Sequence, residues 1–225
     1  MKNVRIKAIG GFLFLLFVMA AAIFLPAWTF TYWQAWIFLA VFGVSVIIIT
    51  AYLATHDPQL LERRVNAGPG AEKEKSQKII QTIAQFAFLL VFVVPAIDHR
   101  LLWSMMPSYL PVIGDIFVAL GLLIVFRVFK ENTFTAATID VGAGQRVIST
   151  GPYAIVRHPM YSGAIVMLLG VPVALGSWWG LLTIIPFVIV VIARLLNEEE
   201  FLAQNLHGYT TYCAKVRWRL VPGVF

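Results

Sequence analysis

Long apolar runs constrain this chain more than any other feature. A helix needs roughly 20 apolar residues to cross a bilayer, and six stretches approach that length: residues 8–30, 33–55, 79–97, 109–129, 161–175 and 178–196. Of the 225 residues, 60% are hydrophobic and only 12% are charged, whereas about one quarter of a soluble domain is charged. The sequence therefore predicts an all-α polytopic membrane protein with five or six transmembrane helices.

The fifth run is shorter than the others and contains Gly170 and Pro172. It is joined to the sixth run by Gly176 and Ser177. We predict that these two runs form a helical hairpin, in which the fifth is either a tight arm or a span that crosses only when tilted.

Basic residues show which ends of the helices share a side. Of the 17 Lys and Arg residues, only Arg100 falls in a loop on the other side from the rest. The positive-inside rule then places both termini and every substantial loop in the cytoplasm, in a bacterial or archaeal cytoplasmic membrane. This distribution accounts for the net charge of +6 without nucleic acid, which we do not expect as a partner.

Two shorter features lie near the first spans. The basic start and apolar run are similar to a signal peptide, but Pro26 and the aromatic residues Trp28 and Trp33 are typical of an interfacial belt, so we expect a retained first span. In the loop that follows the second span, PQLLERRV has the pattern of a short amphipathic helix on the membrane surface.

Polar side chains are costly beside lipid unless they face water or a site, and they concentrate in residues 145–161 and 194–219. A hairpin would bring these two segments to one membrane surface and into one pocket. Pro159 suits the first turn of a helix, with His158 near the N-cap, where free N–H groups can hold an anion. The alternative is that Arg157 reaches lipid phosphate and His158 only caps the helix.

The second polar segment contains an acidic triplet, Glu198, Glu199 and Glu200. Arg194 could pair with Glu198 at i,i+4, which leaves two carboxylates. Three carboxylates oppose the dipole at a helix C-terminus unless the helix runs on into the tail. An acidic cluster at a pocket calls for a cation: a metal, an ammonium or a sulfonium. Because no His-x-x-His or Glu-x-x-His spacing accompanies the triplet, we expect no metal.

These residues carry a resemblance. GQRVISTGPYAIVRHPMYSG, an apolar hairpin and NEEEFLAQNLHGYTTYCAKVRWRLVPG together resemble the isoprenylcysteine carboxyl methyltransferase and phospholipid methyltransferase superfamily of integral membrane enzymes. The resemblance covers the last third of the chain, and it divides the chain into an N-terminal four-helix region, 1–130, and a C-terminal methyltransferase region, 131–225.

The resemblance implies S-adenosylmethionine as the cofactor and methyl donor. By motif position, the implied cofactor contacts are Gln145, Arg146, Val147, Ile148, Tyr153, His158, Pro159, Met160 and Tyr161. It also implies that Glu199 binds the cofactor amino group, that Glu200 completes the acidic pair, and that Arg194 contacts the acceptor. Arg194 and Glu200 are thus the expected catalytic residues.

The expected reaction is in-line methyl transfer to a lipophilic acceptor that enters from the bilayer. A carboxylate acceptor is already ionised and needs only a cation such as Arg194, whereas a thiol or an amine must lose a proton and the sequence offers no obvious base. This favours an isoprenylcysteine-like or other hydrophobic carboxylate over a phospholipid amine or a thiol. Two further alternatives stay open: a membrane sterol reductase that uses a nicotinamide cofactor, and a non-catalytic scaffold.

Overall fold

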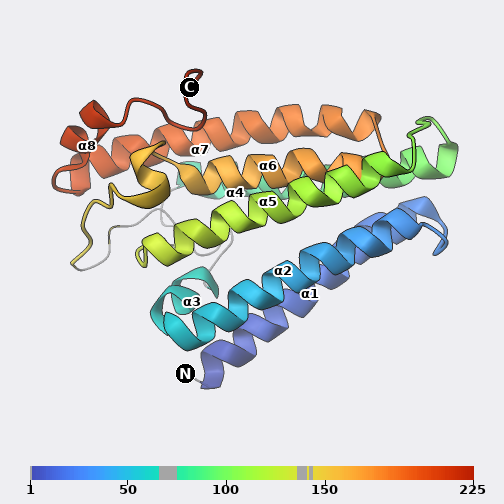
Figure 1. Cartoon of the computed structure of the whole chain (residues 1–225), viewed down its shortest axis with the longest axis horizontal. Coiled ribbons are helices and arrows are strands. Elements are labelled where there is room, and N and C mark those ends of the chain that lie inside the picture. The colour runs from blue at the N-terminus through green and yellow to red at the C-terminus, as the bar shows by residue number, and fades with distance from the viewer. Residues whose placement is uncertain (1, 66–74, 136–140, 142–143) are drawn as a thin grey trace.

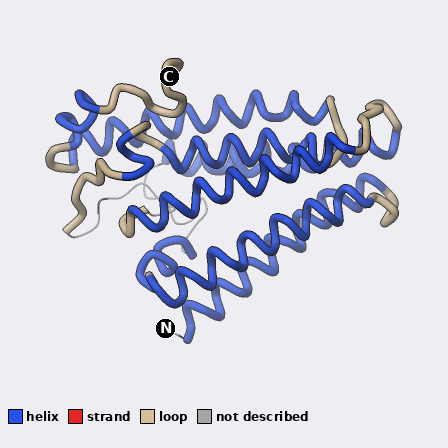
Figure 2. Tube along the Cα trace, viewed as in Figure 1, coloured by secondary structure: helices blue, strands red, loops and turns tan. Residues whose placement is uncertain are grey.

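The structure, a computed structural model, describes residues 2–65, 75–135, 141 and 144–225. Within these residues, helices joined by loops are present and there are no strands (Figure 2). Its elements are α1 (Lys2–Ala27), α2 (Trp33–His56), α3 (Pro58–Val65), α4 (Lys75–Leu101), α5 (Tyr109–Glu131), η2 (Gly151–Ala154), α6 (Pro159–Ala174), η3 (Trp179–Thr183), α7 (Ile184–Asn205) and α8 (Tyr209–Lys215). The all-α prediction is confirmed.

Five of the described helices are long and apolar enough to cross a membrane, namely α1, α2, α4, α5 and α7 with the 3-10 turn before it. The sixth apolar helix, α6, has 16 residues and is therefore about 24 Å long at 1.5 Å per residue. A bilayer core is roughly 30 Å thick, so α6 alone falls short of it. The prediction of five or six spans is confirmed, and the short member is the one that the sequence singled out.

The helices alternate in direction, so that the chain termini gather toward one end of the bundle (Figure 1). That end also carries α3, η2 and α8, and we call it the pocket end. The turns between α1 and α2, α4 and α5, and α6 and α7 lie at the opposite end. This arrangement brings the two polar segments of the sequence together, as the hairpin predicted.

The closest helix pair is α5 and α6, rather than α6 and its hairpin partner α7. Glycines make this approach possible. A Cβ added at Gly121 would lie 2.4 Å from the amide nitrogen of Met167, and one at Gly170 would lie 2.6 Å from the carbonyl oxygen of Gly114. Small residues are a common means of close backbone packing between membrane helices, and here they hold the middle and the C-terminal part of α6 against α5.

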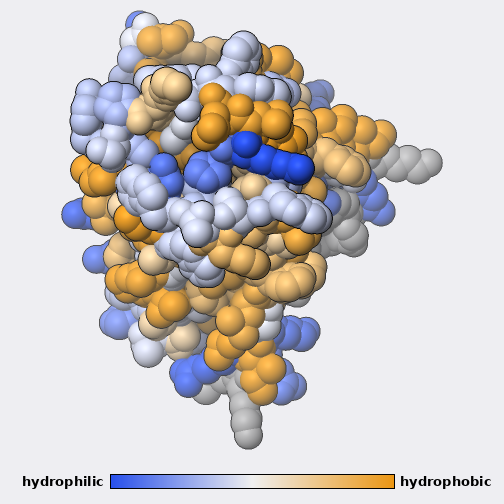
Figure 3. Space-filling view, turned by 90° about the vertical axis from the view of Figure 1, so that its right-hand side faces the viewer, coloured by the Kyte–Doolittle hydropathy of each residue, from blue (hydrophilic) through white to orange (hydrophobic). Residues whose placement is uncertain are grey.

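At the end opposite the pocket, a buried carboxylate on α4 links the loop after α4 to the loop after α6. Asp98 is only 1% exposed and accepts hydrogen bonds from the amide of Ser104 at 2.7 Å and from the hydroxyls of Ser104 and Ser177. The apolar run of the sequence ends at residue 97, whereas α4 continues to Leu101, and these serines satisfy the carboxylate within it. Strongly hydrophilic side chains form only a small group at this end (Figure 3).

The short helix α3 coincides with the predicted amphipathic segment PQLLERRV. Asp57 starts it by accepting the amide of Leu60 at 3.0 Å, as an N-cap residue does. Leu60 and Leu61 are buried, and the Arg64 guanidinium lies over the Phe129 ring at 5.1 Å. The helix therefore packs onto the bundle below the start of α6.

Candidate active site

A pocket opens at the pocket end, between the C-terminus of α5, the chain that precedes α6, and the ends of α7 and α8. Its empty volume is about 810 Å³ with the open mouth included. Its walls are formed by Asn132, Phe134, Thr135, Gln145, Arg146, Val147, Ile148, Tyr153, Arg157, His158, Pro159, Met160, Tyr161, Glu198, Leu202, Leu206, Tyr209 and Tyr212.

The start of α6 has the predicted form. Pro159 is the first helical residue and His158 occupies the N-cap position. The His158 side chain makes no capping hydrogen bond. Its Nε2 atom instead lies 3.2 Å from Oε1 of Glu199 on α7. Capping alone is therefore not the role of this side chain.

Glu199 is surrounded by three cationic or ionisable side chains. Its Oε1 atom lies 3.1 Å from Nη1 of Arg157 as well as 3.2 Å from His158, and its Oε2 atom lies 2.9 Å from Nε of Arg219. The Arg157 and His158 side chains are 9% and 5% exposed. A buried ion pair stabilises a fold only when each charge has a well-placed partner. This cluster therefore fixes the relative positions of three segments: the residues before α6, the helix α7 and the C-terminal tail.

The C-terminal tail is attached to the same place by its backbone. The amides of Arg157 and His158 donate to the carbonyls of Trp218 and Arg219, each at 2.9 Å. The Ser162 hydroxyl donates to the carbonyl of Leu220 at 2.7 Å. The tail therefore forms the outer support of the residues that begin α6.

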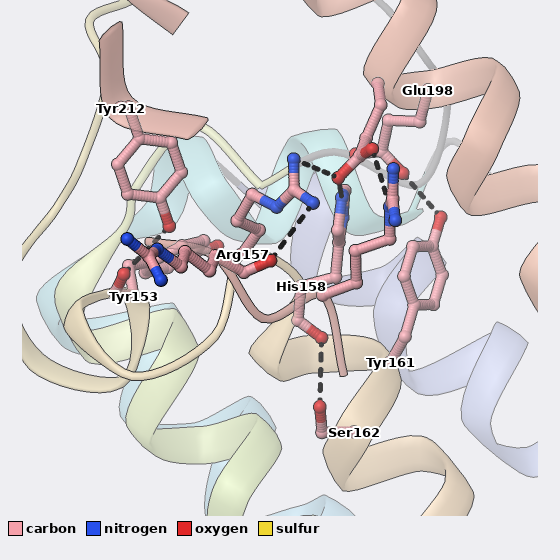
Figure 4. Close-up of polar contacts among 10 residues, drawn as sticks. Tyr153, Arg157, His158, Tyr161, Ser162, Glu198 and Tyr212 are labelled. Atoms are coloured by element: carbon pink, nitrogen blue, oxygen red, sulfur yellow. Dashed lines mark hydrogen bonds and ion pairs between the residues drawn. The ribbon is translucent and has the colours of Figure 1, made fainter. Parts of the chain in front are cut away.

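A second network of side-chain hydrogen bonds runs from the pocket wall into the helix bundle. The Tyr161 hydroxyl donates to Oε2 of Glu198 at 2.7 Å and accepts Nε–H of Arg194 at 3.1 Å. Arg194 also donates to Oε1 of Gln77 at 3.3 Å. Tyr161 thus links Glu198, which lines the pocket (Figure 4), to Arg194, which is outside the pocket lining.

Tyrosines form the opposite wall. Tyr212 donates its hydroxyl to the Tyr153 carbonyl at 2.8 Å, and Asn132 donates to the Tyr153 hydroxyl at 3.0 Å. Burial raises the pKa of Tyr153 to about 12. Burial also raises the pKa of Tyr209 and of Tyr212 above the ordinary tyrosine value. All three phenols are therefore neutral hydrogen-bonding groups at physiological pH.

Two buried polar atoms beside the pocket have no hydrogen-bond partner within the described residues: the Tyr209 hydroxyl and Nε of Arg157. Such atoms are rare in folded proteins and call for a specific explanation. Both residues line the pocket. Each atom has less than 1 Å² of exposed surface, so a bound molecule with acceptor atoms would satisfy them after a shift of the two side chains.

The structure gathers most of the predicted cofactor residues. Nine of them line the pocket: Gln145, Arg146, Val147, Ile148, Tyr153, His158, Pro159, Met160 and Tyr161. The acidic residues are placed differently. Glu198 lines the pocket, Glu199 is enclosed by the three basic side chains, and Glu200 is exposed on α7.

The sequence reasoning missed several wall residues. Asn132, Leu202 and Leu206 carried no signal, since each is an ordinary residue at or near a helix end. Tyr209 and Tyr212 lie in the GYTTY part of the tail that carries the resemblance, and the motif positions implied no cofactor contact for them. In the described ranges no group of three or more His, Cys, Asp or Glu side chains could hold a metal ion.

Residues 110–208 match the model of the phospholipid methyltransferase family. The match covers less than half of the chain and is consistent with the membrane methyltransferase superfamily. The resemblance seen in the sequence is confirmed there, and the phospholipid methyltransferase match extends from α5 through α7 to Gly208, which precedes α8. It therefore includes most of the pocket as well as the tightly packed helix pair.

A curated relative comes from another enzyme class. The chain is 26% identical over 91 residues to a Delta(14)-sterol reductase of Mus musculus, and this stretch is 39% of the chain. The match spans only 22% of the length of the reductase, so it concerns a shared region and not a shared whole protein.

Proposed function

We propose that the protein is an integral membrane methyltransferase that uses S-adenosylmethionine to methylate a lipophilic acceptor. The observation that supports it most is the composition of the pocket in the family-matched region. The pocket lining includes a carboxylate, Glu198, and two residues with an unpartnered donor atom, Tyr209 and Arg157. These groups are complementary to a molecule that carries an ammonium and a carboxylate.

The residues present fit this cofactor. Its carboxylate would accept from the Tyr209 hydroxyl and from Nε of Arg157, and its ammonium would bind Glu198. Tyr153 and Phe134 supply aromatic surface for an adenine. Glu199, which the resemblance assigned to the ammonium, would act by holding Arg157 in place.

The chain contributes position and desolvation. S-adenosylmethionine, when bound, supplies an electrophilic methyl group on a sulfonium. Tyr161, fixed between Glu198 and Arg194, and Met160, beside it in the wall, would orient the reacting end of the donor. Alignment of this kind removes much of the entropic barrier of a two-substrate reaction, and water exclusion strengthens the electrostatic contacts within the site.

For the acceptor we propose a hydrophobic carboxylate, such as an isoprenylcysteine-like compound. Arg194 lies one hydrogen bond behind Tyr161 and would steer an anionic acceptor toward the donor. Glu200, the other expected catalytic residue, is exposed and lies on α7 outside the pocket lining. The family name favours a second candidate, a phospholipid amine, and the sterol reductase relative favours a third, reduction with NADPH.

We propose further that the pocket and both termini face the cytoplasm. Among the described residues, every Lys and Arg except Arg100 lies in an element or segment of the pocket end, and the positive-inside rule orients such an end inward. Cysteine labelling from either side of sealed vesicles, with a single cysteine placed at Lys215 or at Leu102, tests this orientation.

Calorimetry on the purified protein in detergent tests the cofactor. We expect S-adenosylmethionine and S-adenosylhomocysteine to bind and Glu198→Gln to weaken both. Binding of NADPH without either compound would support the reductase instead, and binding of none of the three would leave a non-catalytic protein.

Labelled donor identifies the acceptor. Hydrophobic carboxylates, phospholipid amines and small thiols are each incubated with the protein and methyl-labelled S-adenosylmethionine. We expect label in the carboxylate as an ester, with turnover reduced by Arg194→Ala. Label in the amine or the thiol, or unchanged turnover in Arg194→Ala, would contradict the assignment of the acceptor.

A further inference from the structure

A second cavity lies behind the wall of the pocket. It is a groove between the last two turns of α5, the η2 segment and the C-terminal tail, with an empty volume of about 1310 Å³ including its open side. Pro159 borders both cavities. The segment from Gly151 to Val156 separates them, with Tyr153 on the pocket side and Ile155 on the groove side.

The groove has an apolar floor. Ile124, Ile155, Val156 and Leu220 line it, and Ile155 is 60% exposed on a chain whose helices belong in a bilayer. An apolar hollow beside a transmembrane helix is complementary to lipid acyl chains. The hydrocarbon part of an amphiphile therefore matches this floor.

The rim of the groove is charged. Arg127 is exposed, and within the described residues it forms no hydrogen bond or ion pair. Lys130 lies on the same turn, with its ammonium over the rings of Tyr52 and Phe126 at 5.7 and 5.9 Å. The carboxylate of Glu131 also lines the groove, but it accepts the Thr150 hydroxyl. The guanidinium of Arg127 and the ammonium of Lys130 thus lie in the last turns of α5, directly after its apolar part.

We propose that this groove binds one membrane phospholipid, with the phosphate on Arg127 and Lys130 and the acyl chains on the apolar floor. A guanidinium binds phosphate through two parallel hydrogen bonds, and basic residues at the end of a membrane helix attract lipid head groups. The lipid is a structural ligand of the wall between the two cavities. This site is distinct from the donor pocket, and its occupancy does not depend on methyl transfer.

The lipid would have a mechanical effect on the pocket. The segment that carries Tyr153 and Arg157 has the groove on its other face. A phospholipid seated there fills the hollow behind this segment and links it to α5. We therefore expect phospholipid to raise the melting temperature of the protein in detergent.

Native mass spectrometry of the delipidated protein tests the site. The probes are phosphatidylglycerol and a diacylglycerol with the same acyl chains, which lacks the phosphate, together with inorganic phosphate. We expect one tightly retained phosphatidylglycerol and no retained diacylglycerol. Retention of diacylglycerol to the same extent, or binding of inorganic phosphate that phosphatidylglycerol does not displace, would overturn the proposal.

Variants locate the site. Each basic residue near a lipid surface strengthens association by about fivefold, so Arg127→Gln should weaken phosphatidylglycerol binding by about that factor and Arg127→Lys should largely restore it. Lys215→Gln, which removes a charge from the exposed end of α8, is the matched control. Equal loss in Arg127→Gln and Lys215→Gln would show nonspecific attraction and contradict a specific site. The lipid-free melting temperature of each variant verifies that the fold is unchanged.

Discussion

The guanidinium of Arg157 lies 3.1 Å from the carboxylate of Glu199. This ion pair joins the segment just before α6 to the C-terminal part of α7. Because Arg219 of the tail binds the other oxygen of the same carboxylate, one side chain holds three segments together. Glu198, the preceding residue, faces the pocket instead. Neighbouring glutamates thus have separate tasks, one in the framework of the site and one at its surface.

Removal of the Glu199 carboxylate is therefore expected to destabilise the protein. In Glu199→Ala, Arg157 and His158 stay buried without their partner, and breaking one side of a buried ion pair costs about 3–5 kcal/mol. Thermal unfolding in detergent measures the loss. Glu200→Ala is the control, because Glu200 is exposed and should leave the melting temperature unchanged. Equal stability of the two variants would show that the ion cluster contributes nothing.

Glu198→Gln is expected to weaken donor binding with little effect on stability. The amide keeps the size of the side chain and can still accept the Tyr161 hydroxyl, but it no longer offers a charge to an ammonium. A hydrogen bond to a charged group is worth enough to change affinity by about 10- to 100-fold. Calorimetric titration with S-adenosylhomocysteine measures the change, and an affinity equal to that of the original protein would remove Glu198 from the site.

Gly121→Ala is expected to force α5 and α6 apart. The added Cβ would lie 2.4 Å from the backbone nitrogen of Met167, and backbone cannot rotate away as a side chain can. Overpacking of this kind costs about 1–3 kcal/mol. In the control Gly10→Ala, the new Cβ meets nothing within 4 Å. We expect a lower melting temperature for Gly121→Ala only, and similar values for the two variants would contradict the tight helix contact.

Alkaline pH is expected to destabilise the pocket wall. The pKa of Tyr153 is raised by burial to about 12 in the folded protein from about 10 in an unfolded chain. The folded state then holds its proton more tightly, so stability is fully present below pH 10 and falls as pH rises from about 10 to 12, by roughly 2–3 kcal/mol. Unfolding followed against pH should show a smaller loss for Tyr153→Phe over this interval. An identical slope would mean that other groups cause the loss.

Much of the framework was predictable because it follows from simple patterns. Apolar runs of sufficient length located the helices, and Pro159 after His158 located the start of α6. The amphipathic pattern of PQLLERRV located α3. The spacing of the two polar segments about a hairpin was sufficient to predict that they meet.

The details of the acidic triplet were not predictable in the same way. Adjacent residues on a helix point about 100° apart, so only the position of α7 against α6 decides which glutamate faces the pocket. The choice between α5 and α7 as the main neighbour of α6 likewise depends on four glycines that approach one another across helices. Such pairings join distant parts of the sequence, and no local pattern encodes them.

The length of α6 has a consequence for how the protein is made. This helix is too short to cross the bilayer core unaided, and its glycine face leaves backbone unprotected until α5 covers it. A face of small residues packs closely against a neighbouring helix. We therefore expect α5 to remain beside the insertion machinery until α6 has been synthesised, so that the two helices enter the membrane as one unit and the site is assembled at the moment of integration.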